Sequence, residues 1–209
     1  MLMNDKRFLP FLPSRRRLSF VMLAAALLAA ARVAAAAPPS VGGKIVAGAR
    51  AQIGDVYDAS YVGLAYPNGD VARRRGACTD VVIRALRGVG HDLQREVYAD
   101  RRRRGVSRPD RSIDHRRVRN LRDFFARHGQ TLTRQVTPQT LAAGVWRPGD
   151  IVCWKLPNGL DHIGIVSDQK NAAGSVPLVI HNIGPTCREE DCLTAWPITD
   201  HFRYPPDKI

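Results

Sequence analysis

The sequence predicts an α+β fold in which N-terminal helices pack on a C-terminal antiparallel sheet. In its first half, apolar residues recur at helical spacing, whereas the segment after Arg147 alternates between strand-like runs and turns. Helices followed by a run of antiparallel strands are typical of α+β proteins. Once residues 1–37 are set aside as a leader, 172 of the 209 residues remain, a length that suits one domain with a sizeable core.

The clearest predicted helix begins at Cys78. Its positions 78, 81, 82, 85, 86 and 89 are apolar and fall on a single face, and Gly90 suits the C-terminal cap. A weaker helix is expected from Asp92 to about Arg103, and a short one over 45–53. Asn120 is expected to cap a further helix that stops at Gly129.

The predicted strands follow two turns, at 147–150 and 157–159. They are expected at 151–156, 161–167, 178–182 and 198–204. Residues 105–119, which contain proline and several arginines, are expected to form a loop.

Residues 1–37 have the layout of a secretory signal peptide: a basic start, an apolar run from Leu18 to Ala31, and small residues before a cleavage site. The run is shorter than the ~20 residues a spanning helix needs, so no stable membrane anchor is expected. Residues 38–209 would then form a single domain, periplasmic or secreted. Arg15–Arg17 leaves general secretion and twin-arginine export both open.

The positive charge is concentrated in one segment. Without residues 1–37 the net charge is +8, and residues 101–127 alone hold eleven Arg and three Asp. No aromatic interleaving or nucleic-acid motif accompanies these arginines, and export also argues against a nucleic-acid partner. A basic face attracted to peptidoglycan or another anionic envelope polymer is the more useful interpretation.

Four cysteines in an exported chain invite disulfides. Cys187 and Cys192 bracket a short acidic loop and are expected to pair, leaving Cys78 and Cys153 reduced; a Cys78–Cys153 disulfide is the alternative. No metal site is expected, since the sequence has neither H-E-x-x-H nor paired C-x-x-C units, and no cofactor is expected.

Cys78, His162 and His181 occur in an order that a papain-like cysteine nucleophile can use. At the first turn of a helix the dipole favours the thiolate, so the pKa of Cys78 is expected below ~8.5. His162, on a predicted strand, would act as the general base. Because strand side chains alternate, only one of His181 and Asn182 can face the same way as His162.

Several phrases resemble the NlpC-type cell-wall cysteine peptidases, which have a papain-like fold. These are Cys78 at a helix start, the turn and strand at 147–152, the strand 162–166 and the strand 179–181. Residues 66–70, 113–117 and 181–184 also resemble an uncharacterised bacterial family, a domain of unknown function, over about 45–204. The resemblance implies a Cys–His–polar site with His181 as third residue, Asn182 being the alternate.

The chain departs from the NlpC-type pattern at the nucleophile, where Ala77-Cys78-Thr79-Asp80 replaces the usual D-C-S-G, so the family's substrate details are not carried over. Tyr57 and Tyr61 are candidate substrate contacts because related enzymes place a tyrosine upstream of the cysteine. Asp161 is a further candidate, and His115 a minor one within a charged loop.

The function expected from these residues is that of an exported cysteine hydrolase acting on amide bonds of peptidoglycan peptides. Two alternatives stay open: a non-catalytic envelope binding protein on the same fold, and a thiol acyltransferase.

Overall fold

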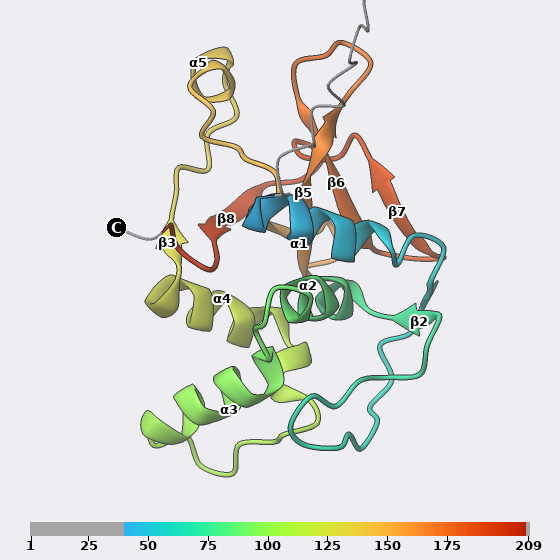
Figure 1. Ribbon diagram of the computed structural model, residues 1–209, viewed down its shortest axis with the longest axis vertical. Helices are drawn as coiled ribbons and strands as arrows, with labels where there is room; N and C mark the ends of the chain where they lie inside the picture. The colour runs from blue at the N-terminus through green and yellow to red at the C-terminus, as the bar shows by residue number, and fades with distance from the viewer. Residues whose placement is uncertain (1–39, 208–209) are drawn as a thin grey trace, which may run out of the picture. The chain divides into compact units, whose positions relative to one another are not determined.

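The computed structural model describes residues 40–207 (Figure 1). The predicted signal peptide lies outside these residues. Five α-helices and a short 3-10 helix (η1) are present in the described part: α1 Val41–Arg50, α2 Cys78–Arg87, α3 Leu93–Arg103, η1 Asp114–Arg116, α4 Val118–His128 and α5 Pro138–Ala142. None of the described helices has both the length and the apolar character needed to cross a membrane.

A six-stranded sheet follows the helices along the chain, with the strand order β3-β8-β4-β5-β6-β7 and antiparallel neighbours throughout. Its strands are β3 Gln130–Thr131, β4 Ile151–Lys155, β5 Asp161–Lys170, β6 Pro177–Asn182, β7 Cys187–Glu190 and β8 Ile198–Arg203. Two short strands, β1 Val56–Tyr57 and β2 Arg75–Gly76, form a separate parallel pair. The predicted fold class is confirmed.

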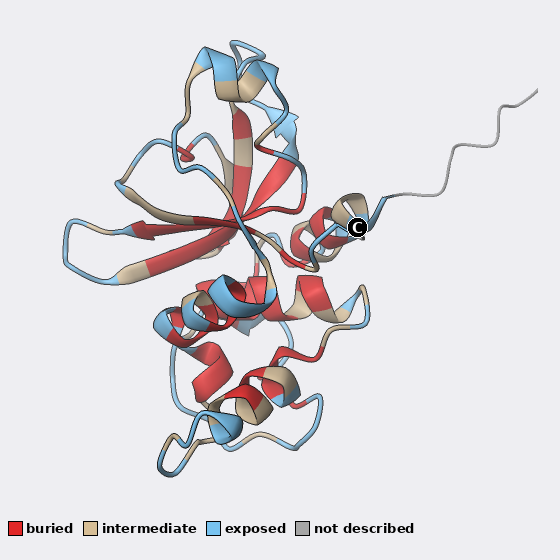
Figure 2. Ribbon diagram, turned by 90° about the vertical axis from the view of Figure 1, so that its left-hand side faces the viewer, coloured by how far each residue is buried: buried red, intermediate tan, exposed pale blue. Residues whose placement is uncertain are grey.

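The sheet is buried on both faces, as the red central strands of Figure 2 show. One face packs against α1, α2 and α4, which lie beside β5 in Figure 1. Alternate residues of the strands, such as Ile163 and Ile180, join this helix-side core together with Cys78. The residues between them, such as Val166 and Val179, join a second core.

The second core lies on the opposite face of the sheet and is built differently. Here the strands meet Trp146, Leu193 and, at its margin, Trp196 from the connecting segments. We call this face of the sheet the tryptophan face. The alternation of strand side chains therefore decides which candidate residues face the helices and which face the tryptophans.

Several parts of the fold differ from expectation. The helix α4 begins at Val118, so Asn120 lies inside it and does not cap it. The first helix begins at Val41, because Ser40 caps it by accepting a hydrogen bond from the N–H of Gly43 at 3.1 Å. The segment 187–190, predicted as an acidic loop, is the strand β7, paired along its length with β6.

Candidate active site

Cys78 is the first residue of α2, and a buried ion pair between Asp80 and Arg116 holds the start of this helix. The Asp80 carboxylate accepts from the N–H of Ala77 at 2.7 Å and thereby ties off the helix start. The same carboxylate binds the Arg116 guanidinium through two contacts, of 2.9 and 3.0 Å. The Asp80 and Arg116 side chains are only 4% and 2% exposed, so the nucleophile candidate rests on a rigid, desolvated charge pair.

The Cys78 thiol is itself buried, and this reverses the expected direction of its pKa. Burial raises the pKa to about 12, and the nearby Asp80 carboxylate adds to the rise. The peptide N–H groups of Ile163, Thr79 and Cys78 act in the opposite direction but do not offset the loss of solvent. The prediction of a depressed pKa is therefore wrong: the resting thiol is protonated, because desolvation outweighs the helix dipole.

Two histidines and a glutamate form a chain across three neighbouring strands on the tryptophan face. His162 Nε2 on β5 lies 2.8 Å from His181 Nδ1 on β6. His181 Nε2 lies 2.9 Å from Glu190 Oε1 on β7. Both histidines are almost wholly buried, at 2% and 1% exposure, whereas the Glu190 side chain is 35% exposed. The chain thus runs from the interior toward solvent.

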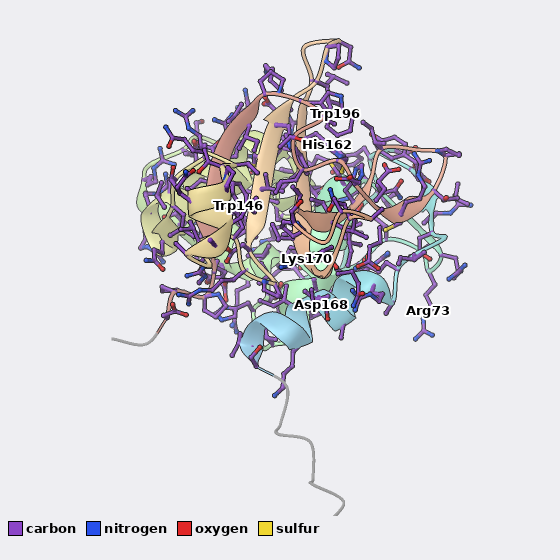
Figure 3. All side chains as sticks on the ribbon, turned by 90° about the horizontal axis from the view of Figure 1, so that it is seen from above. Arg73, Trp146, His162, Asp168, Lys170 and Trp196 are labelled. Atoms are coloured by element: carbon purple, nitrogen blue, oxygen red, sulfur yellow. The ribbon has the colours of Figure 1, made fainter. Side chains whose placement is uncertain are left out.

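Aromatic rings enclose the histidine pair. The His162 ring stacks on Trp154 of β4 with centroids 5.6 Å apart, and Trp196 meets both histidines at 5.9 and 6.0 Å. Figure 3 shows His162 and Trp196 side by side. Burial among these rings lowers the pKa of His162 to about 3, with His181 as a secondary cause. Burial also lowers the pKa of His181, against the opposing influence of Glu190.

The structure brings the two histidines together but does not bond them to Cys78. The thiol belongs to the helix-side core with Ile163, whereas His162, one residue earlier in β5, stacks on Trp154 of the tryptophan face. Among the described residues there is no hydrogen bond between Cys78 and His162. The Cys78 sulfur lies near the peptide N–H of Ile163, and Ile163 directly follows His162 in β5.

Asn182 occupies the helix side of the sheet and holds the segment that leads into α2. Its Nδ2 donates to the carbonyl of Gly76 at 2.9 Å and to that of Asp55 at 3.2 Å. Its Oδ1 accepts from the N–H of Gly184 at 3.2 Å. With its amide used in this way, Asn182 has no described contact with His162, and the ring partner of His162 is His181.

All four cysteines are free thiols, so the predicted Cys187–Cys192 disulfide is wrong. The physical reason is that residues 187–190 form a strand. Cys187 lies opposite Asn182 and enters the helix-side core, whereas Cys192 enters the core on the tryptophan face. Cys192 Sγ lies 3.2 Å from His181 Nε2 instead.

The four predicted substrate contacts are scattered. Tyr57 is 42% exposed and lies near Cys78, and burial is the main cause that raises its pKa. Tyr61 is 63% exposed and bonds Asp110 at 3.3 Å. Asp161 bonds Lys155 at 2.7 Å on the neighbouring strand β4.

His115 does not lie in a solvated loop, as the charged sequence around it suggested. It is 2% exposed within the short helix η1, and burial lowers its pKa to about 4. The charged residues near His115 form ion pairs within the protein. For example, Asp114 accepts a hydrogen bond from Arg101 at 2.9 Å.

The sequence analysis missed Glu190 and the Asp80–Arg116 pair, and it gave Cys192 a different partner. Asp80 at the third position of a predicted helix was a usable sign, because acidic residues there commonly cap the helix start. Arg116 had no comparable sign, since one arginine among many in a loop does not reveal its partner. Glu190 would have required recognising residues 187–190 as a strand.

The antiparallel sheet, the helix that begins at the cysteine and the histidines on adjacent strands form the α+β fold that the resemblance to the NlpC-type proteins implied. The chain belongs to the family described as a domain of unknown function (DUF1287), whose model matches residues 46–204. It is 48% identical over 170 residues to the uncharacterized protein YijF of Escherichia coli K12, covering 77% of this chain and 80% of that protein.

Two solved structures are similar to this chain, to different degrees. An N-acetylmuramoyl-L-alanine amidase from Bacteroides uniformis has a TM-score of 0.52 at 14% identity, with 78% of this chain and 98% of that chain covered. NlpC1 from Trichomonas vaginalis has a TM-score of 0.46 at 16% identity, covering 81% of this chain and 46% of that chain. At such identities the likeness concerns the fold.

Proposed function

We propose that this protein is an exported cysteine hydrolase that cleaves amide bonds in peptidoglycan peptides, with Cys78 as nucleophile and His162 as general base. The observation that carries the proposal is the chain of contacts His162–His181–Glu190, together with a cysteine at a helix start whose sulfur lies near the N–H of Ile163, the residue after His162. The fold shared with a Bacteroides amidase supports the choice of bond and polymer.

The contacts constrain where protons must lie. His162 Nε2 faces His181, so only Nδ1 of His162 is left to take a proton from a thiol. In that state His162 Nε2–H donates to His181 Nδ1, and His181 Nε2–H donates to the Glu190 carboxylate. His181 and Glu190 are then positioning residues that fix the tautomer of the base.

The reaction would proceed by general-base catalysis from a neutral thiol. As a substrate carbonyl arrives, the Cys78 S–H proton passes to His162 Nδ1 while sulfur bonds to the carbonyl carbon. The imidazolium returns the proton to the leaving amine, which leaves a thioester on Cys78. Water then gives its proton to His162, attacks the thioester carbon, and releases the acid and the thiol.

The burial of the site has a consequence for this chemistry. Cys78 is 8% exposed and His162 is 2% exposed, so substrate entry requires side chains around them to shift. The half-exposed Tyr57, next to Cys78, and Trp196, over the histidines, are the groups whose displacement would open a path. Closure against water also strengthens the electrostatic interactions within the site.

A covalent trapping experiment tests the proposal. An electrophilic analogue of a peptidoglycan stem peptide is incubated with the protein, and the modified residue is located by peptide mass spectrometry. We expect a single adduct on Cys78, slowed by about 10²–10⁴-fold in His162→Ala and less in His181→Ala. Cys153→Ala is the matched control, since it removes another buried thiol of the helix-side core.

The enclosed thiol favours one other function, that of a non-catalytic protein that binds the envelope polymer. A protonated thiol with no hydrogen bond to His162 among the described residues is an unprimed nucleophile. Under this alternative the analogue leaves Cys78 unmodified, while the wild type and Cys78→Ala co-sediment equally with purified peptidoglycan.

A further inference from the structure

Three potential metal ligands converge at the outer end of the histidine chain. His181 Nε2, a Glu190 carboxylate oxygen and Cys192 Sγ all lie within 4.8 Å of one another. We propose that they form a binding site for a divalent transition metal ion of the zinc class. Imidazole, carboxylate and thiolate are the donors that zinc takes in proteins.

The distances suit an ion with small adjustments. His181 Nε2 lies 2.9 Å from Glu190 Oε1 and 3.2 Å from Cys192 Sγ. In a tetrahedral zinc site, ligand bond lengths of about 2.0–2.3 Å place neighbouring donor atoms about 3.3–3.6 Å apart. His181 Nε2 therefore needs to move away from each of the other two donors by only a few tenths of an ångström, and all three donors lie within 4.8 Å of one another.

Charge and access also fit a cation. If Cys192 loses its proton on binding, its thiolate and the Glu190 carboxylate together balance a divalent ion, and Asp191 lies between them along the chain. Arg188 is the opposing charge: its guanidinium lies 3.8 Å from Glu190 Oε1 and donates to the carbonyl of Gly184 at 3.2 Å, and its side chain is 47% exposed. Glu190 is 35% exposed and offers a path for the ion.

The support around His181 is the kind that metal-binding histidines use. A ligating imidazole commonly donates its second N–H to a fixed acceptor, which orients the ring. Here the second nitrogen, Nδ1, lies 2.8 Å from His162 Nε2. Three protein ligands would leave a fourth position for water or another small ligand.

Metal binding would also govern the proposed nucleophile, an extension that rests on the proposed function. A metal on His181 Nε2 leaves the ring proton on Nδ1, which then donates to His162 Nε2. The proton of His162 must in that case lie on Nδ1, the atom that would accept from Cys78. The loaded site therefore blocks the base, and the ion acts as an inhibitor that is removed before turnover.

Cobalt(II) titration of the full chain tests the site, with visible and near-ultraviolet absorption as readout. We expect one Co²⁺ per chain, with d–d bands of a tetrahedral ion and a thiolate-to-cobalt charge-transfer band that Zn²⁺ displaces. Cys192→Ser should lose the charge-transfer band, and Glu190→Gln should weaken Co²⁺ binding at least tenfold. Cys187→Ser, which alters a thiol on the other face of the sheet, should keep both.

The outcomes distinguish metal binding at His181, Glu190 and Cys192 from the proposed effect of the metal on Cys78. Absence of the charge-transfer band in the wild type, or its persistence in Cys192→Ser, overturns the metal site. Loss of the charge-transfer band in Cys78→Ser also overturns the metal site, because the cobalt ligand would then be Cys78 and not Cys192. Circular dichroism of each variant confirms that it is folded, and Glu190→Gln supplies an independent ligand test. A cobalt site that leaves the rate of Cys78 alkylation unchanged supports the metal site and overturns only the coupling.

Discussion

The buried pair of Asp80 and Arg116 gives the sharpest prediction about stability. Asp80→Asn keeps the shape of the side chain but removes its charge, leaving the Arg116 guanidinium uncompensated in a site where its side chain is 2% exposed. Breaking one partner of a buried pair typically costs about 3–5 kcal/mol. With a slope of about 2 kcal/mol per molar urea, the unfolding midpoint should fall by about 2 M.

The matched control is Asp168→Asn. Asp168 also pairs with an arginine, Arg50, but their side chains are 42% and 34% exposed. An exposed pair contributes about 0–1 kcal/mol, so this midpoint should barely move. Equilibrium urea unfolding followed by circular dichroism measures both variants. Equal, small shifts in the two would refute the argument that α2 and Cys78 rest on a desolvated charge pair.

Three further predictions follow from burial and hydrogen bonding. Because burial lowers the pKa of His115 to about 4, the unfolded state binds its proton first as pH falls below ~6.5. The free energy of unfolding should therefore drop by up to ~3 kcal/mol between pH 6.5 and 4, and a pH series of urea melts should show a shallower drop in His115→Gln. Cys78 alkylation by iodoacetamide should keep rising with pH toward the raised pKa of about 12, and a plateau below pH 8.5 would show a preformed thiolate. Asn182→Ala removes the hydrogen-bond donor to two buried carbonyls and should lower the free energy of unfolding by about 1–3 kcal/mol in urea melts. An unchanged free energy of unfolding would contradict the role of Asn182 in holding the segment before α2.

The predictable parts of the fold were those in which one pattern dominates. The helix from Cys78 presents an unbroken apolar face, and its observed start is the predicted one. The strands at 151–155 and 161–170 follow clear turns and were expected within a few residues. The choice between His181 and Asn182 depended on strand register, which the sequence alone did not give.

The unpredicted parts are those set by contacts distant in the sequence. Residues 187–190 carry three charged side chains, and their strand is apparent only from pairing with β6. The Cys187–Cys192 disulfide was expected because these residues were read as a loop. The thiol of Cys78 illustrates a different limit, because a helix start predicts a lowered pKa while tertiary burial reverses it. His115 looked solvated since its charged neighbours find their partners elsewhere in the chain.

The most direct test of the central claim is the product profile from purified peptidoglycan, read by liquid chromatography and mass spectrometry. We expect the wild type and Cys153→Ala to release the same soluble peptide-containing fragments, and Cys78→Ala to release none while remaining folded. The newly formed termini identify the amide bond that is cut. Release of the same fragments by Cys78→Ala would contradict the assignment of Cys78 as nucleophile and, with it, the proposed hydrolase.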